Sequence, residues 1–334
     1  MTRLVNHLGL LPVNIYIRPA PTPTAVPACA SQYSEMHPFP FYTRQPKIPT
    51  SAKAKYLPLA RLSAGVDGFV ILAAPRSNPP TISNVVALKL FRPEVGCSVP
   101  RRLLEELITM QDRYKDKHLI AAVHDYPPAT NWIAMAYVPG RSISELMKMQ
   151  YKDVGMPPCL VFHLFAELVT AQAYLKEHGL CHADLNEGGN VMLSAKEGHT
   201  WPSVTLVDYG GMQLHDEIMA IDHTMWLLQK TVNRQVRVGA CWRREQFDQD
   251  DLERADMLYG LVCMYDSSNG EGRNMTLERL WKKCDWIAEL RMEKLRDEIA
   301  LVGLEKELNG ARWTKEDIGV LAEGGGIAIE EVDG

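Results

Sequence analysis

The sequence predicts an α+β protein with two lobes, in which a small antiparallel sheet with one helix precedes a mainly helical half. Between residues 57 and 138, short β-branched and apolar runs such as GFVILAA, VVALKLF and WIAMAYV alternate with turn signals, which is typical of strands. Beyond residue 157 the pattern becomes helical. The stretch CLVFHLFAELVTAQAYLKEHG is apolar on almost every side, which indicates a buried helix, and Gly179 gives that helix a stop signal.

The individual elements follow from local patterns. Strands are predicted at residues 68–74, 85–91, 119–126 and 132–138. The helix that interrupts them covers residues 101–114, where leucines recur at spacings of three and four. After the buried helix, the apolar runs VML and TLVDYGG predict two short strands flanking a turn. Further helices are predicted at residues 220–232, 252–265 and 276–304.

Composition divides the chain into four parts. Residues 1–55 are rich in proline, threonine, serine and alanine without any regular period, which predicts a disordered arm. Residues 56–138 form the predicted N-lobe and residues 139–322 the predicted C-lobe. Residues 323–334 are rich in glycine and acidic side chains, which predicts a flexible tail.

The bulk numbers favour an ordinary globular protein, with 46% hydrophobic and 23% charged residues in a chain of 334. A net charge of −5 provides no general attraction to nucleic acid or to an anionic membrane, and we expect neither as a partner. We read no apolar run in the sequence as long enough for a membrane span. Seven scattered cysteines without a CxxC pair favour a reducing interior, either cytoplasm or nucleus.

Polar side chains that could take part in catalysis or metal binding follow the buried helix. Asp184 and Asn190 lie in HADLNEGGNVML, and Asp208 lies in LVDYGG, all in turn-rich sequence between apolar runs. Carboxylate and amide oxygens of this kind are ligands that Mg²⁺ prefers. Two loops that carry such groups on a packed base predict a catalytic or binding site.

Two upstream features complete a set suited to phosphoryl transfer from ATP. Lys89 lies inside an apolar strand, where an ammonium is costly without an anion beside it, although a lysine that extends from an edge strand to solvent fits as well. Gly65 and Gly68 bracket a turn whose backbone N–H groups could approach phosphate oxygens. A plain hairpin turn is the alternative for this pair.

Taken together, GVDGFV, VVALK, EELITM, WIAMAYVPGRSISEL, LCHADLNEGGNVML and LVDYGG resemble six motifs of the eukaryotic protein-kinase-like superfamily, in that family's order. The motifs are the glycine-rich loop, the strand lysine, the helix glutamate, the hinge, the catalytic loop and the metal-binding triplet. The resemblance covers residues 57–211 and implies a bilobal kinase fold with ATP and Mg²⁺ as cofactors. Small-molecule kinases of the aminoglycoside and choline phosphotransferase type are relatives in the same superfamily.

The resemblance implies a role for each matching residue. Asp184 would accept or orient the proton of the attacking hydroxyl, and Asn190 and Asp208 would hold magnesium. Lys89 would neutralise the α and β phosphates, paired with Glu106, while Glu105 is the second choice for that pair. The residues that would surround the nucleotide are Gly65, Gly68, Val70, Ala87, Met135, Ala136 and Val138. Among them, Ala87 would pack on the adenine, and the backbones of Ala136 and Val138 would hydrogen-bond its edge. His182 would brace the catalytic loop.

The sequence departs from the family pattern in the catalytic loop. Five residues, 185–189, separate Asp184 from Asn190, where the family has four. A bulge at Gly188 and Gly189 would accommodate the extra residue, because glycine adopts such conformations at little cost.

Single substitutions also differ from the family. Asn186 replaces a lysine that touches the transferred phosphate, which removes a cation from the transition state. Ala183 replaces an arginine, so we expect no control by a phosphorylated activation loop. Ser63 at the first loop glycine and Tyr209 in the triplet are mild changes. After Gly211 the resemblance thins, and no APE-like anchor is found.

Three hypotheses follow. The first is an active ATP- and magnesium-dependent phosphotransferase that acts on protein serine or threonine hydroxyls, or alternatively on a small molecule. The second is a pseudokinase that binds nucleotide or a partner. The third is coincidence, with Asp184 and Asp208 as solvated turn residues and Lys89 as a surface lysine.

Overall fold

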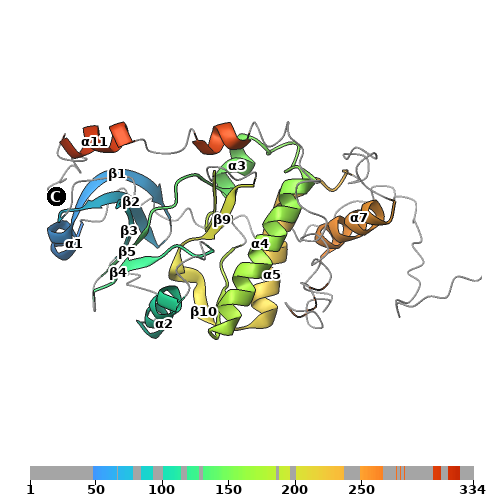
Figure 1. Cartoon of the computed structure of the whole chain (residues 1–334), viewed down its shortest axis with the longest axis horizontal. Coiled ribbons are helices and arrows are strands. Elements are labelled where there is room, and N and C mark those ends of the chain that lie inside the picture. The colour runs from blue at the N-terminus through green and yellow to red at the C-terminus, as the bar shows by residue number, and fades with distance from the viewer. Residues whose placement is uncertain are drawn as a thin grey trace, which may run out of the picture. The chain divides into compact units, whose positions relative to one another are not determined.

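Figure 1 shows the chain as a computed structural model. The structure describes residues 48–65, 67–77, 84–92, 101–113, 119–127, 131–185, 188–195, 201–236, 249–265, 276, 279, 282, 304–309 and 315–323. The predicted arm up to residue 47 and the tail from residue 324 lie outside these ranges, as does nearly all of the helix predicted at 276–304.

The first half of the described chain forms a five-stranded antiparallel sheet with the strand order β1-β2-β3-β5-β4. The strands are β1 (Tyr56–Ala64), β2 (Gly68–Pro75), β3 (Val86–Phe91), β4 (Val123–Asp125) and β5 (Trp132–Ala136). Helix α2 (Arg101–Arg113) interrupts them in sequence and packs against β4. This arrangement confirms the predicted sheet with one helix, and β3 lies at its centre.

Alternation along β3 gives the sheet two different faces, because successive side chains of a strand point to opposite sides. Val86, Leu88 and Leu90 belong to one apolar cluster. Ala87 and Phe91 belong to the main core, which also contains leucines of α2 and residues of the helical half. Lys89 has the same parity as Ala87, so it is on the face that looks toward the rest of the core.

The opposite face of the sheet is covered by α1 (Thr50–Lys55), where Ala52 is fully buried. The indole N–H of Trp132 donates to Ser51 Oγ at 3.0 Å, and the ring of Trp132 meets that of Tyr56 edge-on at 5.8 Å. The prediction of a disordered arm is therefore wrong for residues 48–55. A single large indole on the sheet stabilises a six-residue helix that composition alone would not favour.

The second half is mainly helical, as predicted. Its helices include α3 (Ile143–Met149), α4 (Pro158–Glu177), α5 (Glu217–Thr231) and α7 (Gln249–Met264). Helix α4 begins at a proline and is followed by Gly179 with φ +69°, the residue expected to stop it. By length and composition α4 could cross a membrane, contrary to the sequence-based expectation that no run is long enough, but 72% of that stretch is buried inside the protein. Helices α4 and α5 lie side by side (Figure 1).

Two small sheets in the first part of the C-lobe carry the loops of interest. Strands β6 (Arg141–Ser142), β8 (Val191–Ser194) and β9 (Ser203–Leu206) form one sheet, and β7 (Leu180–His182) pairs with β10 (Met212–Leu214) in the other. The pairing of β8 with β9 confirms the two short strands predicted from VML and TLVDYGG. The C-lobe also joins the N-lobe through its backbone, because the N–H of Ala121 donates to Leu206 O at 2.9 Å.

The described C-terminal part contacts both lobes. Residues 304–309 are helical, and Leu304 and Leu308 are buried in the main core. Helix α11 (Lys315–Glu323) instead packs on β1, where Ile318 is fully buried beside Leu59. No helix was predicted here, and residues 315–322 were counted with the C-lobe, because a few apolar positions cannot tell which lobe they will cover.

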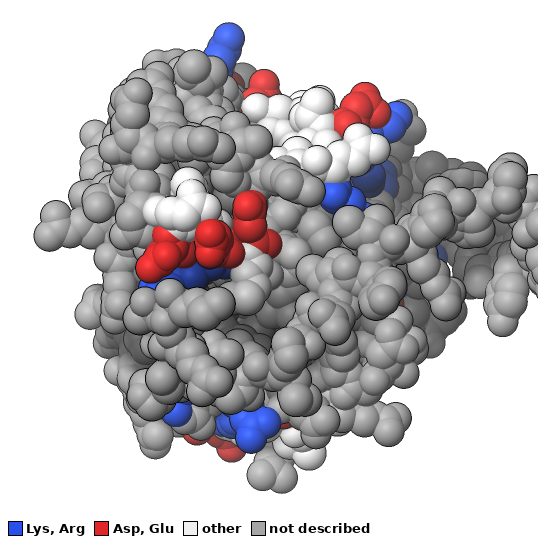
Figure 2. Space-filling model, turned by 90° about the vertical axis from the view of Figure 1, so that its right-hand side faces the viewer, with Lys and Arg blue, Asp and Glu red and all other residues white. Residues whose placement is uncertain are grey.

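Figure 2 shows the side of the protein on which α7 lies in Figure 1. Acidic, basic and uncharged side chains of the described residues occur there in small separate groups. Helix α7 exposes an apolar side chain, Met257, and one basic side chain, Arg254. Its exposed acidic side chains include Asp250, Glu253 and Asp256. The described part of this face therefore has mixed charge.

A buried histidine makes the stability of the fold depend on pH. His163 of α4 stacks on Trp201 at 5.0 Å, and its Nε2 is 2.8 Å from Pro202 O. Burial lowers the pKa of His163 to about 4, from an ordinary value near 6.5. The unfolded chain therefore binds a proton on this residue between these two pH values, while the folded protein does not.

We expect the free energy of unfolding to fall by about 3 kcal/mol as pH drops from 6.5 to 4 on account of His163. In His163→Gln the amide can still donate to Pro202 O but does not titrate, so this part of the pH dependence should disappear. Chemical unfolding of both proteins across this pH range measures the difference. Equal pH dependence in the two proteins would contradict the assignment.

Candidate active site

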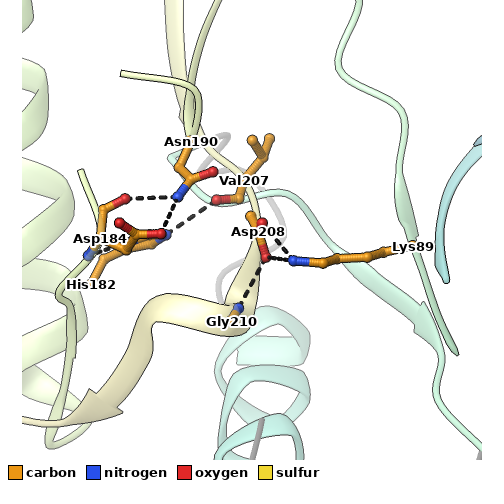
Figure 3. Close-up of polar contacts among 7 residues, drawn as sticks. All are labelled: Lys89, His182, Asp184, Asn190, Val207, Asp208 and Gly210. Atoms are coloured by element: carbon orange, nitrogen blue, oxygen red, sulfur yellow. Dashed lines mark hydrogen bonds and ion pairs between the residues drawn. The ribbon is translucent and has the colours of Figure 1, made fainter. Parts of the chain in front are cut away.

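Lys89 of the central strand β3 forms an ion pair with Asp208 from the segment after β9 (Figure 3). Its Nζ lies 2.5 Å from Asp208 Oδ1 and 2.6 Å from Oδ2, and the lysine side chain is only 5% exposed. A buried ammonium needs such a partner, because desolvation without an anion is costly. The alternative of an edge-strand lysine that reaches solvent is therefore wrong.

Asp208 adopts a backbone conformation that directs its carboxylate at the lysine. Its φ is +66°, the only positive φ of a non-glycine residue within the described ranges. The N–H of Gly210 donates to Asp208 Oδ1 at 3.0 Å. A left-handed conformation in a residue with a side chain is strained and persists where surrounding contacts enforce it, which is frequent at functional sites.

The catalytic loop keeps Asn190 in contact with Asp184 despite the extra residue. The Nδ2 of Asn190 donates to the backbone oxygen of Asp184 at 2.7 Å and to its Oδ2 at 2.9 Å (Figure 3). Because Nδ2 is occupied by these contacts, Oδ1 is the oxygen that could bind a metal ion.

Gly188 absorbs the additional length of the loop. Its φ is +67°, its N–H donates to Leu185 O at 2.9 Å, and its own oxygen accepts from the N–H of Ser144 at 3.1 Å. These contacts agree with the bulge expected at the glycine pair, although only Gly188 uses a positive φ. Residues 186 and 187 lie outside the described ranges, so the substitution at Asn186 stays a sequence observation.

His182 connects the two loops, as expected of a bracing residue. It is fully buried, its Nε2 is 3.1 Å from Val207 O, and its Nδ1 accepts from the N–H of Asp184 at 3.4 Å. Burial lowers the pKa of His182, mainly by desolvation, so the ring is neutral at pH 7. Both contacts are satisfied by the tautomer with its proton on Nε2.

Gln172 of α4 fixes His182 from the other side, and the sequence analysis missed it. The N–H of His182 donates to Gln172 Oε1 at 3.1 Å, and Gln172 Nε2 donates to His182 O at 2.9 Å. Gln172 is fully buried. Its amide in an otherwise apolar helix was a signal that could have been read, because a buried amide needs partners.

Gly211 is the second residue that was missed, since the triplet ends at Gly210. The N–H of Ala183 donates to Gly211 O at 2.9 Å. A β-carbon added at position 211 would lie 2.3 Å from Asp184 Cβ, closer than side-chain carbons can approach. Glycine at this position therefore lets the segment after Asp208 lie directly against the catalytic loop.

Three of the residues predicted to surround the nucleotide, Val70, Ala87 and Met135, lie on the Lys89 face of the sheet. Val70 pairs with Lys89 across β2 and β3, and Ala87 pairs with Met135 across β3 and β5. The N–H of Ala136 donates to Ala122 O at 2.7 Å, so this group is not available to a base. Val138 is half-buried just beyond β5.

Glycine is needed at the two positions of the predicted phosphate loop to different degrees. A β-carbon at Gly68 would lie 1.9 Å from Leu90 O, so glycine there permits the close approach of β2 to β3. Gly65 has open space around it, and its N–H donates to Gly68 O at 2.8 Å. The pair therefore closes a tight hairpin turn between β1 and β2, which was the alternative interpretation.

The predicted pairing of Lys89 with Glu106 is not present in the structure. Among the described residues, the ion pair of Lys89 is with Asp208. Glu106 is half-buried and Glu105 is exposed on α2, which packs against β4 and β10. The left-handed Asp208 brings a carboxylate to the ammonium at shorter range than α2 does, and the sequence could not reveal this.

The donor set suits magnesium better than a transition metal. Within the described ranges no group of three or more His, Cys, Asp or Glu side chains is placed to hold a metal ion. Asp208 and Asn190 offer hard oxygen ligands, and Mg²⁺ is usually bound by one or two protein groups together with substrate phosphates and water. The residues present therefore fit magnesium.

The connection from the triplet to the next helix is short. Only residues 212–215 separate Gly211 from Asp216, whose side chain caps α5 by accepting from the N–H of Met219 at 3.0 Å. All residues from 201 to 236 are described, so this length is a property of the folded chain. It leaves no room for a long segment between the triplet and α5.

Three solved structures of the kinase domain of PknI from Mycobacterium tuberculosis are similar to this chain. The unmutated domain has 19% identity and a TM-score of 0.46 over 70% of this chain and 96% of its own. A single mutant of that domain has 20% identity and a TM-score of 0.46, and a double mutant has 20% identity and a TM-score of 0.47. Each match covers 71% of this chain and 96% of the mutant domain. No protein-family model and no curated protein matches the chain.

The described part of the chain has the predicted α+β architecture. The antiparallel sheet with its interrupting helix precedes the helical half, the central strand carries the lysine, and the two loops after α4 carry Asp184 and Asp208. This is the order of parts that the resemblance implied.

We expect Gly211→Ala to displace Asp184, because the new β-carbon would overlap it. Overpacking of this kind costs about 1–3 kcal/mol, measurable as a lower free energy of unfolding. Gly189→Ala is the matched control, since a β-carbon there meets nothing within 4 Å and the φ of Gly189 is not positive. Equal stability of the two variants would contradict the close contact between Gly211 and Asp184.

Proposed function

We propose that this protein is an ATP- and magnesium-dependent phosphotransferase. The observation that supports it most directly is the convergence of a buried lysine and two aspartates from three segments far apart in sequence. Lys89 meets Asp208, and Asp208 is connected to the Asp184 loop through Val207 and His182. Asp184 itself is exposed, but the lysine and the histidine that connect these segments are buried, which a coincidence of solvated turn residues would not explain.

Each residue has a role in this proposal. Lys89 binds phosphate oxygens of ATP, and Asp208 and Asn190 hold magnesium, which neutralises charge that develops on the phosphates. Asp184 orients the acceptor hydroxyl and takes its proton as the oxygen bonds to the γ-phosphorus. The bond between that phosphorus and the β–γ bridging oxygen breaks, and ADP leaves.

The geometry of Asn190 supports an active enzyme over a pseudokinase. The pseudokinase hypothesis rested on the extra loop residue, which would swing Asn190 away from the metal. Instead, Asn190 donates twice to Asp184, at 2.7 and 2.9 Å, and Gly188 takes up the added length.

The acceptor hydroxyl has two candidate sources. Protein serine or threonine is the acceptor expected from the resemblance. A small-molecule hydroxyl is the second candidate, and it is favoured by residues 212–215, the short connection between the triplet and α5. Protein kinases place an activation loop between triplet and APE motif, and four residues cannot build one. The alanine at position 183 agrees with the absence of control through such a loop.

The first test is whether the protein binds nucleotide. ATP with magnesium should raise the melting temperature, because a ligand stabilises the state that binds it. No shift at saturating nucleotide would overturn the proposal.

The second test concerns Asp184. Asp184→Asn should lower phosphate transfer or ATP turnover by ~10²–10⁴ while the thermal shift with ATP and magnesium is retained, because the variant loses a proton acceptor and keeps Lys89 and Asp208. Asp153→Asn makes the same change of charge at an exposed turn residue and should match the native rate. Turnover of Asp184→Asn at the native rate would exclude the assigned role.

The acceptor class is decided by a panel of serine and threonine peptides against amino alcohols and aminoglycosides, with transfer of labelled γ-phosphate as the readout. Transfer to small molecules and none to peptides is the result that the short connection favours. Transfer to peptides would show that another surface replaces the missing segment.

A further inference from the structure

The turn between β1 and β2 is fixed to the end of β3 by a single residue. The backbone N–H of Arg92 donates to Asp67 O at 2.9 Å, and its guanidinium donates to Gly65 O at 3.2 Å. Together with the bond from Gly65 to Gly68, these contacts fold the turn down toward the sheet. The position of Asp67 is therefore set by backbone contacts and does not depend on its own side chain.

The carboxylate of Asp67 reaches the region where Lys89 and Asp208 meet. A β-carbon placed on Gly210 would lie 3.5 Å from Asp67 Oδ2, 3.5 Å from Lys89 Nζ and 3.3 Å from Asp208 Oδ1. Charged atoms from three segments thus surround one small volume beside Gly210, the glycine of the triplet. The glycine-rich loop of the family was expected to contribute only backbone N–H groups at this place.

The charges of Lys89, Asp208 and Asp67 beside Gly210 sum to −1, while the guanidinium of Arg92 is bound at Gly65 O. Both oxygens of Asp208 contact the ammonium of Lys89, so one carboxylate already neutralises the lysine. Within the described ranges, Asp67 makes no ion pair of its own. An approaching polyphosphate would meet an excess negative charge, and like charges at short range repel.

We propose that Asp67 makes nucleotide binding dependent on a divalent cation, by presenting a third oxygen ligand, in addition to Asp208 and Asn190, on the phosphate side of the site. This inference rests on the proposed function. A cation such as Mg²⁺ binds carboxylate and phosphate oxygens together, so it converts the repulsion between Asp67 and the phosphates into a shared contact. Asp67 therefore selects the metal complex of the nucleotide against the free nucleotide.

The experiment measures the dissociation constant of a non-hydrolysable ATP analogue by calorimetry, once with saturating magnesium and once with excess chelator. The proteins are the native chain, Asp67→Asn, Asp67→Glu and Asp153→Asn. The dissociation constant with chelator divided by that with magnesium is the ratio that reports metal dependence, and it needs no turnover. Asp67→Asn is nearly isosteric, and melting curves without nucleotide verify that each variant is folded.

In Asp67→Asn the ratio should fall about tenfold, as expected for the loss of one unit charge near the phosphates. Binding without metal should become tighter and binding with magnesium weaker. Asp67→Glu should keep most of the native ratio, and Asp153→Asn should keep all of it.

The outcomes separate this inference from the proposed function. Binding by the native chain with an unchanged ratio in Asp67→Asn overturns the inference and leaves the proposed function standing. Tighter binding of Asp67→Asn in both conditions means that Asp67 only repels the nucleotide, which also overturns it. No binding by the native chain in either condition overturns the proposed function, and this inference with it.

Discussion

The ion pair between Lys89 and Asp208 is the constraint on which the rest of the site depends. It joins the central strand of the N-lobe to the loop after β9, so the two lobes meet through opposite charges. Burial of the ammonium makes the pair obligatory, because loss of the carboxylate would leave an uncompensated charge. The left-handed backbone of Asp208 is the local strain that this pairing requires.

The polar residues of the site are held in place by the buried helix α4. Helix α4 is buried along most of its length, yet its Gln172 binds both backbone groups of His182, and His182 in turn holds the N–H of Asp184. The backbone of Asp184 is therefore fixed by uncharged groups, while its carboxylate accepts from Asn190. The close contact of Gly211 with Asp184 adds a steric limit to the hydrogen-bonded one.

The sequence predicted those features that depend on local pattern. Alternating apolar runs predicted β2, β3 and β5, and Gly179 marked the end of α4, because strand period and helix stop are encoded within a few residues. The partner of Lys89 was predicted wrongly as Glu106, since the choice among carboxylates is made by how α2 and Asp208 pack in three dimensions. Helix α1 was missed for the same reason: a helix of six residues needs packing on the sheet, where Trp132 is one of its contacts.

The placement of the C-terminal segments has a mechanical consequence. Leu308 is anchored in the main core, while Ile318 is anchored on β1, and five residues, 310–314, connect the two helical segments. Such a stretch spans at most about 20 Å when fully extended. The short connection therefore limits how far β1, the outer strand of the sheet, can move away from the main core.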